Sequence, residues 1–311
     1  MVKKLFLGVD GGGTKTIAVI VDGEKKVLGW GVGGSVNYHN VGAESVGENL
    51  EKSVEKALHQ AGVSSLSYGV LGLAGCDTKK DKKILSEIVR KSFLGQILKE
   101  RFVVCNDTVI GLYSGTRPPG VVIVAGTGCN VYGQNKEGKE ARAGDWGFLL
   151  GDQGGAFRMG LLALETAVKS FDGRIEKSLL EDLVFKKFDD IDNLIDWAYK
   201  KPVEVERIAS LAPLVEKAAQ REDKAACEIL KKTAFELSLG VKAVGQRLGL
   251  FDKPFKIVLT GSVFTIKIIL LDELKKQVFH FAPKAEFVFP KTQPAVAAAL
   301  LAKEKYGQIC S

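Results

Sequence analysis

The sequence predicts an α/β protein of two domains, each built on a mixed sheet that is flanked by helices. Short apolar runs come first and then alternate with helical segments over residues 5–115, which is typical of a mixed sheet covered by helices. A segment with two prolines and a glycine at 116–120 interrupts the chain, and the same pattern starts again after it. The succession of an apolar strand, a Gly-rich turn and a second strand therefore occurs twice, which indicates an internal duplication.

The chain of 311 residues is long enough for two domains with substantial cores. The first domain is expected to span residues 1–116, and the C-terminal helix at 295–311 is a candidate addition to it. The second domain is expected to span residues 117–294 and to contain a helical insertion. Both lengths fall within the usual domain range of about 50–250 residues.

Composition and charge exclude several classes of protein. Hydrophobic residues make up 46% and charged residues 26%, which is ordinary for a globular chain. The net charge of +7 comes from scattered Lys and Arg pairs without interleaved aromatic residues, so we expect no nucleic-acid partner. No apolar run approaches the roughly 18 residues of a membrane span, so we expect no membrane partner. Asp10 ends the first apolar run too early for a signal peptide. The chain has five cysteines, and this odd number argues against a disulfide framework. We therefore expect a cytoplasmic protein.

The first Gly-rich turn has the features of a phosphate-binding turn. An apolar run at 5–9 leads through Asp10 into three glycines, and a second run follows at 17–21, so we expect two strands joined by a tight turn. Glycines there let backbone N–H groups converge on an anion, and an aspartate at the strand end can hold a hydrated Mg²⁺ that bridges phosphate oxygens. The alternative is an ordinary Gly-rich hairpin. The candidate nucleotide contacts in this turn are Gly11, Gly12, Gly13, Thr14 and Lys15.

The rest of the first domain alternates strands and helices. We assign helices from apolar residues at helical spacing and strands from short apolar runs. Asn37 lies in a polar loop and is either a turn residue or a substrate contact. The expected elements are a strand at 27–32, the polar loop at 33–40, a helix at 44–61, a buried strand at 68–74, a helix around 84–89 and a strand at 102–105.

Asp107 is the candidate general base, because it follows directly after the end of a buried strand. A carboxylate at that place can accept the proton of an attacking hydroxyl as the hydroxyl oxygen bonds to phosphorus. The alternative is that Asp107 caps a helix that begins at Thr108. The residues alone leave both roles open.

The second domain repeats the strand–turn–strand phrase and then becomes mainly helical. A strand at 121–125 meets a second Gly-rich turn at 126–129, and two such turns could bind a polyphosphate from opposite sides of a cleft. The elements expected after this turn are a strand at 131–134, a Gly- and Asp-rich loop at 143–155, helices over 156–217 with breaks near 172 and 201, a long helix at 223–248, a strand at 255–259, a helix around 271–278, a strand at 286–289 and a final helix from Pro294 to about 306.

Two further groups of residues could bind substrates. Trp146 and Asp152 in the Gly-rich loop suit a sugar, because an indole face covers ring C–H groups and a carboxylate binds hydroxyls; the alternative for Trp146 is core packing. Gly261 and Ser262 follow a strand and suit the close approach of a flat purine. The three histidines lack metal-ligand spacing, so we expect no metal site made by the protein alone.

The motifs taken together resemble those of the actin/hexokinase/heat-shock-chaperone ATPase superfamily. Residues 8–14, 106–107, 125–128 and 260–262 match, in order, its phosphate-1, acceptor-base, phosphate-2 and adenosine motifs. The segment GDWGFLLGDQG at 144–154 resembles the GGWG…GDEG segment of N-acetylglucosamine kinases, in the wider BadF/BadG-type ATPase group.

This resemblance implies two RNase H-like domains with a cleft between them, a homodimer, and transfer of the γ-phosphate of Mg-ATP to the 6-hydroxyl of N-acetylglucosamine or a related amino sugar. It gives Asp107 the base role and Asp10 the Mg-ATP role. The residues it places around the sugar are Asn37, Gly75, Asp77, Asp107, Thr127, Gly128, Trp146 and Asp152. The further nucleotide contacts it implies are Gly126, Thr127, Gly128, Gly261 and Ser262.

Three departures from the family pattern leave the acceptor open among N-acetylglucosamine, glucosamine and another hexose derivative. The family's SGGD is AGCD at 74–77, Cys129 replaces a serine, and Gln153 replaces a glutamate. Two alternative functions also remain at this stage. One is an activator ATPase of the 2-hydroxyacyl-CoA dehydratase type, which holds an iron–sulfur cluster, and the other is a non-catalytic nucleotide switch of the actin type.

Overall fold

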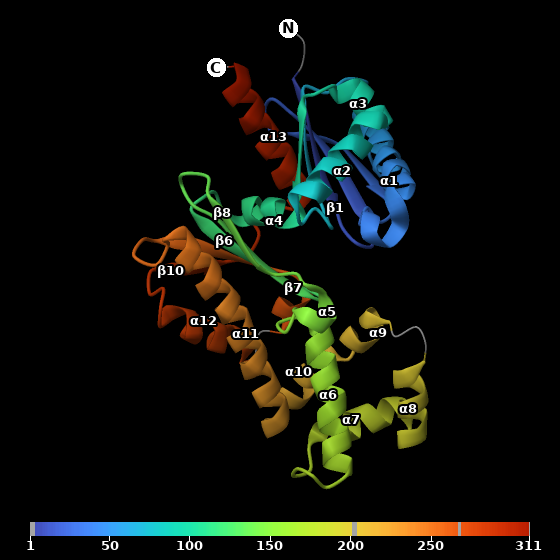
Figure 1. Ribbon diagram of the computed structural model, residues 1–311, viewed down its shortest axis with the longest axis vertical. Helices are drawn as coiled ribbons and strands as arrows, with labels where there is room; N and C mark the ends of the chain where they lie inside the picture. Colours follow the sequence, from blue (N-terminus) through green and yellow to red (C-terminus); the bar gives the residue numbers. More distant parts are fainter. Residues whose placement is uncertain (1–3, 201–203, 267–268, 311) are drawn as a thin grey trace. The chain divides into compact units, whose positions relative to one another are not determined.

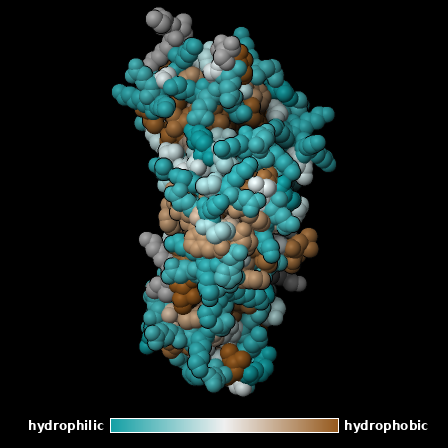
Figure 2. All heavy atoms as spheres, turned by 90° about the vertical axis from the view of Figure 1, so that its left-hand side faces the viewer, coloured by the Kyte–Doolittle hydropathy of each residue, from teal (hydrophilic) through white to brown (hydrophobic). Residues whose placement is uncertain are grey.

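The computed structural model describes residues 4–200, 204–266 and 269–310, and the chain divides into two compact units (Figure 1). The first unit contains Met1–Arg117 together with Pro290–Ser311, and the second contains Pro118–Phe289. Figure 2 shows hydrophilic side chains over most of the face that it draws, with smaller apolar patches among them. No helix in the described ranges is long and apolar enough to cross a membrane.

The first unit is built on a mixed five-stranded sheet. Its strands lie in the order β3-β2-β1-β4-β5, with β1, β2 and β3 antiparallel and β1, β4 and β5 parallel. Parallel neighbours bring the ends of β1, β4 and β5 to the same edge of the sheet. The bounds are β1 Leu5–Gly11, β2 Thr16–Asp22, β3 Val27–Gly33, β4 Tyr68–Leu73 and β5 Phe102–Asn106.

Helices cover both faces of this sheet because side chains alternate along its buried strands. On β1, Leu5 and Leu7 pack with the helices that follow β3 and β4, whereas Phe6 packs with the C-terminal helix. That helix approaches closely at Gly8, where an added Cβ would lie 2.1 Å from the carbonyl oxygen of Ala295. The helices of this unit are α1 Tyr38–Ala61, α2 Lys79–Lys91, α3 Phe93–Leu98, α4 Asp107–Gly115 and α13 Pro294–Cys310.

The second unit repeats the same sheet topology. Its order is β10-β9-β6-β7-β8, with β6, β7 and β8 antiparallel and β6, β9 and β10 parallel, so each strand has a counterpart in the first sheet. The internal duplication and the predicted class of two mixed sheets flanked by helices are therefore confirmed. The bounds are β6 Gly120–Ala125, β7 Cys129–Gln134, β8 Glu140–Gly144, β9 Phe255–Thr260 and β10 Ala285–Val288.

Helices make up most of the rest of the second unit. The long helix α11 packs on α12 and on strands β7 and β8, and α6 packs with α7, α9 and α10 to form the helical insertion. The bounds are α5 Gly147–Leu150, α6 Ala156–Phe171, α7 Leu179–Phe188, α8 Ile191–Tyr199, α9 Val205–Ala209, α10 Ala212–Ala219, α11 Lys224–Leu248, the 3₁₀ helix η1 Ser262–Thr265 and α12 Leu270–Phe279.

The structure corrects several element predictions. Helix α1 begins at Tyr38 rather than at residue 44, because Asn37 caps a first turn that continues across a kink where Gly42 has φ +78°. The loop predicted at 143–155 contains the end of β8 and the short helix α5. Strand β8 and helix α3 were not predicted, because both are too short for a clear periodic pattern. The predicted helix break near 172 coincides with the end of α6 at Phe171. The predicted break near 201 lies outside the described residues.

Candidate active site

The first Gly-rich turn closes directly after β1. The amide of Gly12 donates a hydrogen bond to the carbonyl oxygen of Lys15 at 2.9 Å, while Gly13 and Thr14 are exposed at the tip. Gly11 is buried where an added Cβ would lie 2.3 Å from a methyl group of Val36, so only glycine fits there. The turn therefore presents exposed backbone to solvent and is anchored by a packed glycine at its base.

Asp10 is the last residue before this turn. Burial raises the pKa of its carboxyl from the usual 3.8 to about 6, and the nearby charge of Lys15 offsets part of that effect. A cation bound at Asp10 would restore the charged form, so the carboxylate suits a Mg²⁺ ion. The described residues contain no group of three or more His, Cys, Asp or Glu that could hold a metal ion by themselves. A metal at Asp10 would therefore take most of its ligands from water or from a bound nucleotide.

The second Gly-rich turn, in the other unit, is fastened to the start of α6. The amides of Ala156 and Phe157 donate to the carbonyl oxygens of Gly126 and Thr127 at 2.8 and 3.0 Å. The turn closes on itself through the Gly126 amide, which donates to the carbonyl oxygen of Gly128 at 2.9 Å. The helix thus fixes the conformation of the turn and leaves the side chain of Thr127 exposed.

Gly261 and Ser262 lie beside this second turn in the same unit. Gly261 has φ +106°, and an added Cβ would lie 2.1 Å from the carbonyl oxygen of Ala125. Ala125 is the last residue of β6, directly before the turn. The structure therefore brings the two predicted nucleotide segments of the second unit together.

Two predicted sugar segments of the first unit also lie together. Asn37 caps α1 by accepting a hydrogen bond from the His39 amide at 3.2 Å. Gly75 has φ +78°, and an added Cβ there would lie 2.9 Å from Oδ1 of Asn37. Asp77 follows in the same loop and accepts a hydrogen bond from Nδ2 of Asn106 at 2.9 Å. This last bond connects the loop after β4 with the end of β5.

Asp107 is the first residue of α4, and the helix cap is its neighbour. Oδ1 of Asn106 accepts hydrogen bonds from the amide of Thr108, at 2.9 Å, and from the Thr108 hydroxyl. The alternative role of Asp107 as the helix cap is therefore wrong. Its partly buried carboxyl group lies in the first turn of α4, where the helix dipole stabilises negative charge.

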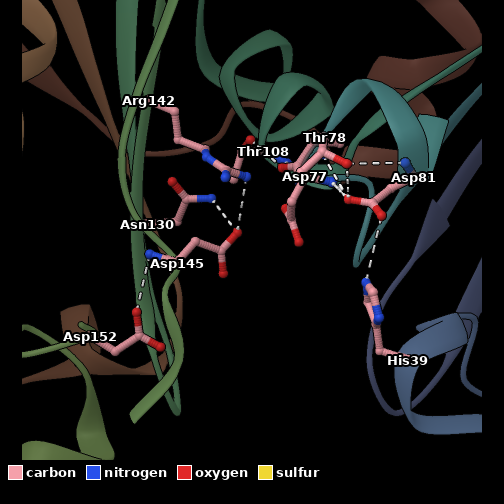
Figure 3. Close-up of polar contacts among 10 residues, drawn as sticks. His39, Asp77, Thr78, Asp81, Thr108, Asn130, Arg142, Asp145 and Asp152 are labelled. Carbon is pink, nitrogen blue, oxygen red and sulfur yellow. Dashed lines mark hydrogen bonds and ion pairs between the residues drawn. The ribbon is translucent and has the colours of Figure 1, made fainter. Parts of the chain in front are cut away.

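In the second unit Asp152 holds the Gly-rich loop against the second turn (Figure 3). Its Oδ1 accepts a hydrogen bond from the Asp145 amide at 3.1 Å. Burial raises the pKa of Asp152, and backbone hydrogen bonds from Asp145, Cys129 and Trp146 counteract part of this effect. Gly128 comes so close that an added Cβ would lie 2.3 Å from Oδ2 of Asp152. These contacts place Asp152 beside Gly128, another predicted sugar contact.

Trp146 is 63% exposed, so its alternative role in core packing is wrong. The guanidinium group of Arg142 lies 5.4 Å from the centre of its indole ring, within the range of a cation–π contact. Leu149 and Leu150 of the adjoining helix α5 are 80% and 81% exposed. The loop therefore offers an unusually apolar surface next to Asp152, with the indole available for a ligand.

Sequence reasoning missed a set of polar side chains around these segments. Asp145 accepts a hydrogen bond from Nδ2 of Asn130 at 2.9 Å and lies 3.7 Å from Arg142, as Figure 3 shows. In the first unit the Tyr38 hydroxyl donates to Asp81, and this hydrogen bond, with burial as the second cause, raises the pKa of Tyr38 to about 12. The TxxD pattern at 78–81 was the available signal, because it is typical of a helix-capping box.

Solved structures of sugar kinases share the fold of this chain. A crystal structure of a candidate N-acetylglucosamine kinase from Chromobacterium violaceum matches with a TM-score of 0.74 at 24% identity, over 96% of this chain and 99% of that chain. The fold is thus that of the actin-like ATPases.

Two curated relatives match over nearly their whole length. An N-acetylmuramic acid/N-acetylglucosamine kinase from Clostridium acetobutylicum is 34% identical over 97% of this chain and 99% of its own length. An N-acetyl-D-glucosamine kinase from Dictyostelium discoideum is 34% identical over 97% of this chain and 98% of its own length. The model of the BadF/BadG/BcrA/BcrD ATPase family matches residues 7–302, and the chain belongs to this family.

Proposed function

We propose that the protein is an ATP-dependent amino-sugar kinase, which transfers the γ-phosphate of Mg-ATP to the 6-hydroxyl of N-acetylglucosamine or a related amino sugar. The observation that carries this proposal is the position of Asp107. Its carboxyl group stands at the end of β5 without a capping role, and its neighbour Asn106 is bonded to the predicted sugar residue Asp77. The names of the curated relatives support the same class of substrate.

In the proposed reaction Asp107 acts on the acceptor. Its carboxylate accepts the proton of the sugar 6-hydroxyl as the hydroxyl oxygen forms a bond to the γ-phosphorus. The bond from that phosphorus to the bridging oxygen of ADP breaks, so the products are the sugar 6-phosphate, ADP and a proton passed to solvent. Asp10 would hold a Mg²⁺ ion, which would offset the negative charge of the phosphate groups.

We propose nucleotide contacts in each unit. The first unit would contribute its Gly-rich turn, with backbone amides and the ammonium group of Lys15 facing phosphate oxygens. The second would contribute its own turn and the strand end at β9. The proposed nucleotide contacts are Gly11, Gly12, Gly13, Thr14, Lys15, Gly126, Thr127, Gly128, Gly261 and Ser262.

Each unit would likewise supply sugar contacts. In the first unit Gly75 lies against Asn37, and Asp77 follows Gly75 in the same loop. In the second unit Gly128 lies against Asp152. The exposed indole of Trp146 would cover one face of the ring, and Thr127 would bond a hydroxyl or a phosphate oxygen. Hydroxyl-binding side chains beside an apolar face suit a sugar, and the names of the curated relatives point to an amino sugar.

The activator ATPase is less well supported. An iron–sulfur cluster is held by thiolates. The two curated relatives that match over nearly the whole chain are instead named as kinases. Iron in stoichiometric amount with the purified protein would favour this alternative instead.

We also propose that the protein works in the cytoplasm as a homodimer that uses magnesium. Family resemblance supports the dimer, and dependence on ATP supports the metal. Light scattering coupled to gel filtration would measure the oligomeric state, and a monomer at micromolar concentration would refute the dimer.

An assay of ADP release tests the function. Purified protein with Mg-ATP would be given N-acetylglucosamine, N-acetylmuramic acid, glucosamine and glucose in separate reactions. We expect strong stimulation by at least one amino sugar and weaker stimulation by glucose. Equal ADP release with and without every sugar would refute the kinase and favour a nucleotide switch.

A further inference from the structure

Asp81 is a buried carboxylate in the first turn of α2, with only 6% of its surface exposed. Its Oδ2 accepts hydrogen bonds from the Thr78 amide at 2.7 Å, the Thr78 hydroxyl at 2.8 Å and the Asp77 amide at 3.2 Å. In return the Thr78 hydroxyl accepts from the Asp81 amide, which completes a capping box at the start of α2. One carboxylate oxygen thus fixes the loop that contains Gly75 and Asp77.

The other carboxylate oxygen of Asp81 binds a different element. The hydroxyl of Tyr38 donates to Oδ1. Nε2 of His39 lies 3.9 Å from the same atom, and Figure 3 shows His39 facing Asp81. The rings of Tyr38 and His39 lie with their centres 4.0 Å apart. Both residues are in the first turn of α1, directly after Asn37. Asp81 therefore bridges the start of α1 and the loop after β4.

These bonds exceed what a capping box requires. A box needs only the reciprocal bonds between Thr78 and Asp81, which are local in the sequence. The contact with Tyr38 spans 43 positions and holds a second segment against a buried charge. Burying a charge is costly unless it is paired or well hydrogen-bonded, so the four donors around Asp81 fix one arrangement of both segments.

We infer that Asp81 is a positioning residue for the acceptor sugar, holding Asn37 on α1 and Gly75 and Asp77 on the following loop at the spacing that sugar binding needs. The inference rests on the proposed kinase function. The same network reaches the base, because Asp77 is bonded to Asn106, the residue before Asp107. In this proposal Asp81 acts through these residues rather than by touching a substrate.

The central test is Tyr38→Phe, which removes the bridge to α1 and leaves the capping box intact. We expect the KM and Kd for the amino sugar to rise about tenfold, within the range that small displacements of substrate-positioning groups produce. The Kd for ATP should stay within about twofold of the wild-type value, because the first Gly-rich turn is held by backbone hydrogen bonds from Val36 and Ala74, which the substitution leaves in place. Asp81→Ala should raise the sugar KM at least as much.

Two further variants separate positioning from stability. Asp81→Asn keeps an oxygen for the backbone amides and an amide group that can donate to the Tyr38 oxygen, so it should recover most of the sugar affinity lost in Asp81→Ala. Asp223→Ala is the matched control, because Asp223 caps α11 and accepts from the Ala226 and Leu179 amides and the Ser178 hydroxyl. This control should lower the melting temperature and leave the sugar KM unchanged.

A double-mutant cycle decides whether Tyr38 acts through Asp81. If it does, Tyr38→Phe combined with Asp81→Ala should raise the sugar KM no more than Asp81→Ala alone. Additive effects, or a wild-type sugar KM in Tyr38→Phe, would overturn the inference while leaving the kinase function standing. Failure of the wild-type protein to bind or phosphorylate any amino sugar would overturn both. Should Asp81→Ala not fold, the sugar Kd of Tyr38→Phe by calorimetry still decides.

Discussion

Asn106 and Asp107 have separate roles: Asn106 caps α4, and Asp107 is the proposed general base. Asn106 caps α4 and bonds to Asp77, so the carboxyl group of Asp107 is not needed for the helix cap. A carboxylate in the first turn of a helix after a buried strand suits a general base that must be held firmly in place.

Asp107→Asn should therefore reduce the transfer rate about 100-fold or more, the scale expected for loss of a general base, with the ATP affinity little changed. Steady-state kinetics and ATP calorimetry would measure both. Asp192→Asn is a suitable control, since Asp192 is an exposed residue in the first turn of α8. An Asp107→Asn protein as fast as the wild type would remove Asp107 from the mechanism.

The raised pKa of Asp10 predicts that the free energy of unfolding depends on pH. Because burial raises its pKa from 3.8 to about 6, the folded chain binds this proton more tightly than the unfolded chain, and stability falls as the pH rises between these values. Asp10→Asn cannot ionise, so it should raise the free energy of unfolding of the ligand-free protein at pH 8 by up to about 3 kcal/mol, at about 1.4 kcal/mol per pKa unit. The gain should shrink toward pH 4.

Thermal denaturation at pH 5 and pH 8 would measure this effect. Mg-ATP should stabilise the wild type at pH 8 and should hardly stabilise Asp10→Asn, which lacks the metal-binding charge. An equal difference in melting temperature at both pH values would show that the charge on Asp10 does not oppose folding.

Single residues could be predicted from the sequence where a local pattern marked them. Asp10 stands before three glycines and Asp107 stands at the end of an apolar strand, and both patterns were visible. The partnership of Tyr38 and Asp81 was not, because it joins residues 43 positions apart through the packing of α1 beside α2. The exposure of Trp146 likewise depends on tertiary structure.

At the scale of elements, the second Gly-rich turn depends on its contact with helix α6. Gly155 precedes the helix, and an added Cβ would lie 2.6 Å from the Thr127 carbonyl oxygen and 2.7 Å from backbone atoms of Gly128. Because these contacts are with backbone atoms of Thr127 and Gly128, relieving them would displace the turn.

Gly155→Ala should therefore displace the turn and weaken ATP binding about tenfold or more, in line with the cost of small displacements at a binding site. Calorimetric titration with Mg-ATP would measure the loss. Gly307→Ala in α13 is the control, because nothing lies within 4 Å of an added Cβ there, and it should bind ATP as the wild type does. Unchanged ATP affinity in Gly155→Ala would argue that this turn does not contact the nucleotide.

Strands bounded by glycine were predicted well, since apolar runs and turn residues are local signals. The start of α1 was predicted wrongly because the helix is kinked at Gly42, which has a positive φ. The turn before this kink does not continue the apolar spacing of the rest of the helix. Strand β8 was missed because its pairing with β7, rather than its own composition, makes it a strand.

At the scale of the whole molecule, the chain begins and ends in the same unit. Helix α13 packs Ala295, Ala298 and Ala299 into one apolar cluster with Phe6 and Val19. The first unit therefore combines two segments that are far apart in the sequence. The duplicated sheet order could be anticipated from the repeated strand–turn–strand phrase, whereas the arrangement of the helical insertion could not, because its helices pack on one another without a repeated motif.

Deletion of residues 294–311 should expose one face of the first sheet and destabilise that unit, because the cluster loses its helix. Hydrogen exchange would show lost protection of β1 and β4 and retained protection of β6 and β9. Deletion of residues 309–311 is the control, since Ile309 is 68% exposed and should not contribute. Wild-type protection of β1 after the longer deletion would contradict this role for α13.

The most direct test of the proposed kinase follows the phosphate itself. Phosphorus NMR of a reaction with Mg-ATP and N-acetylglucosamine, recorded with proton correlation, would identify the carbon that carries the new phosphate. We expect one equivalent of sugar 6-phosphate for each ADP formed. Inorganic phosphate formed at the same rate with and without the sugar, and no sugar phosphate, would contradict an amino-sugar kinase.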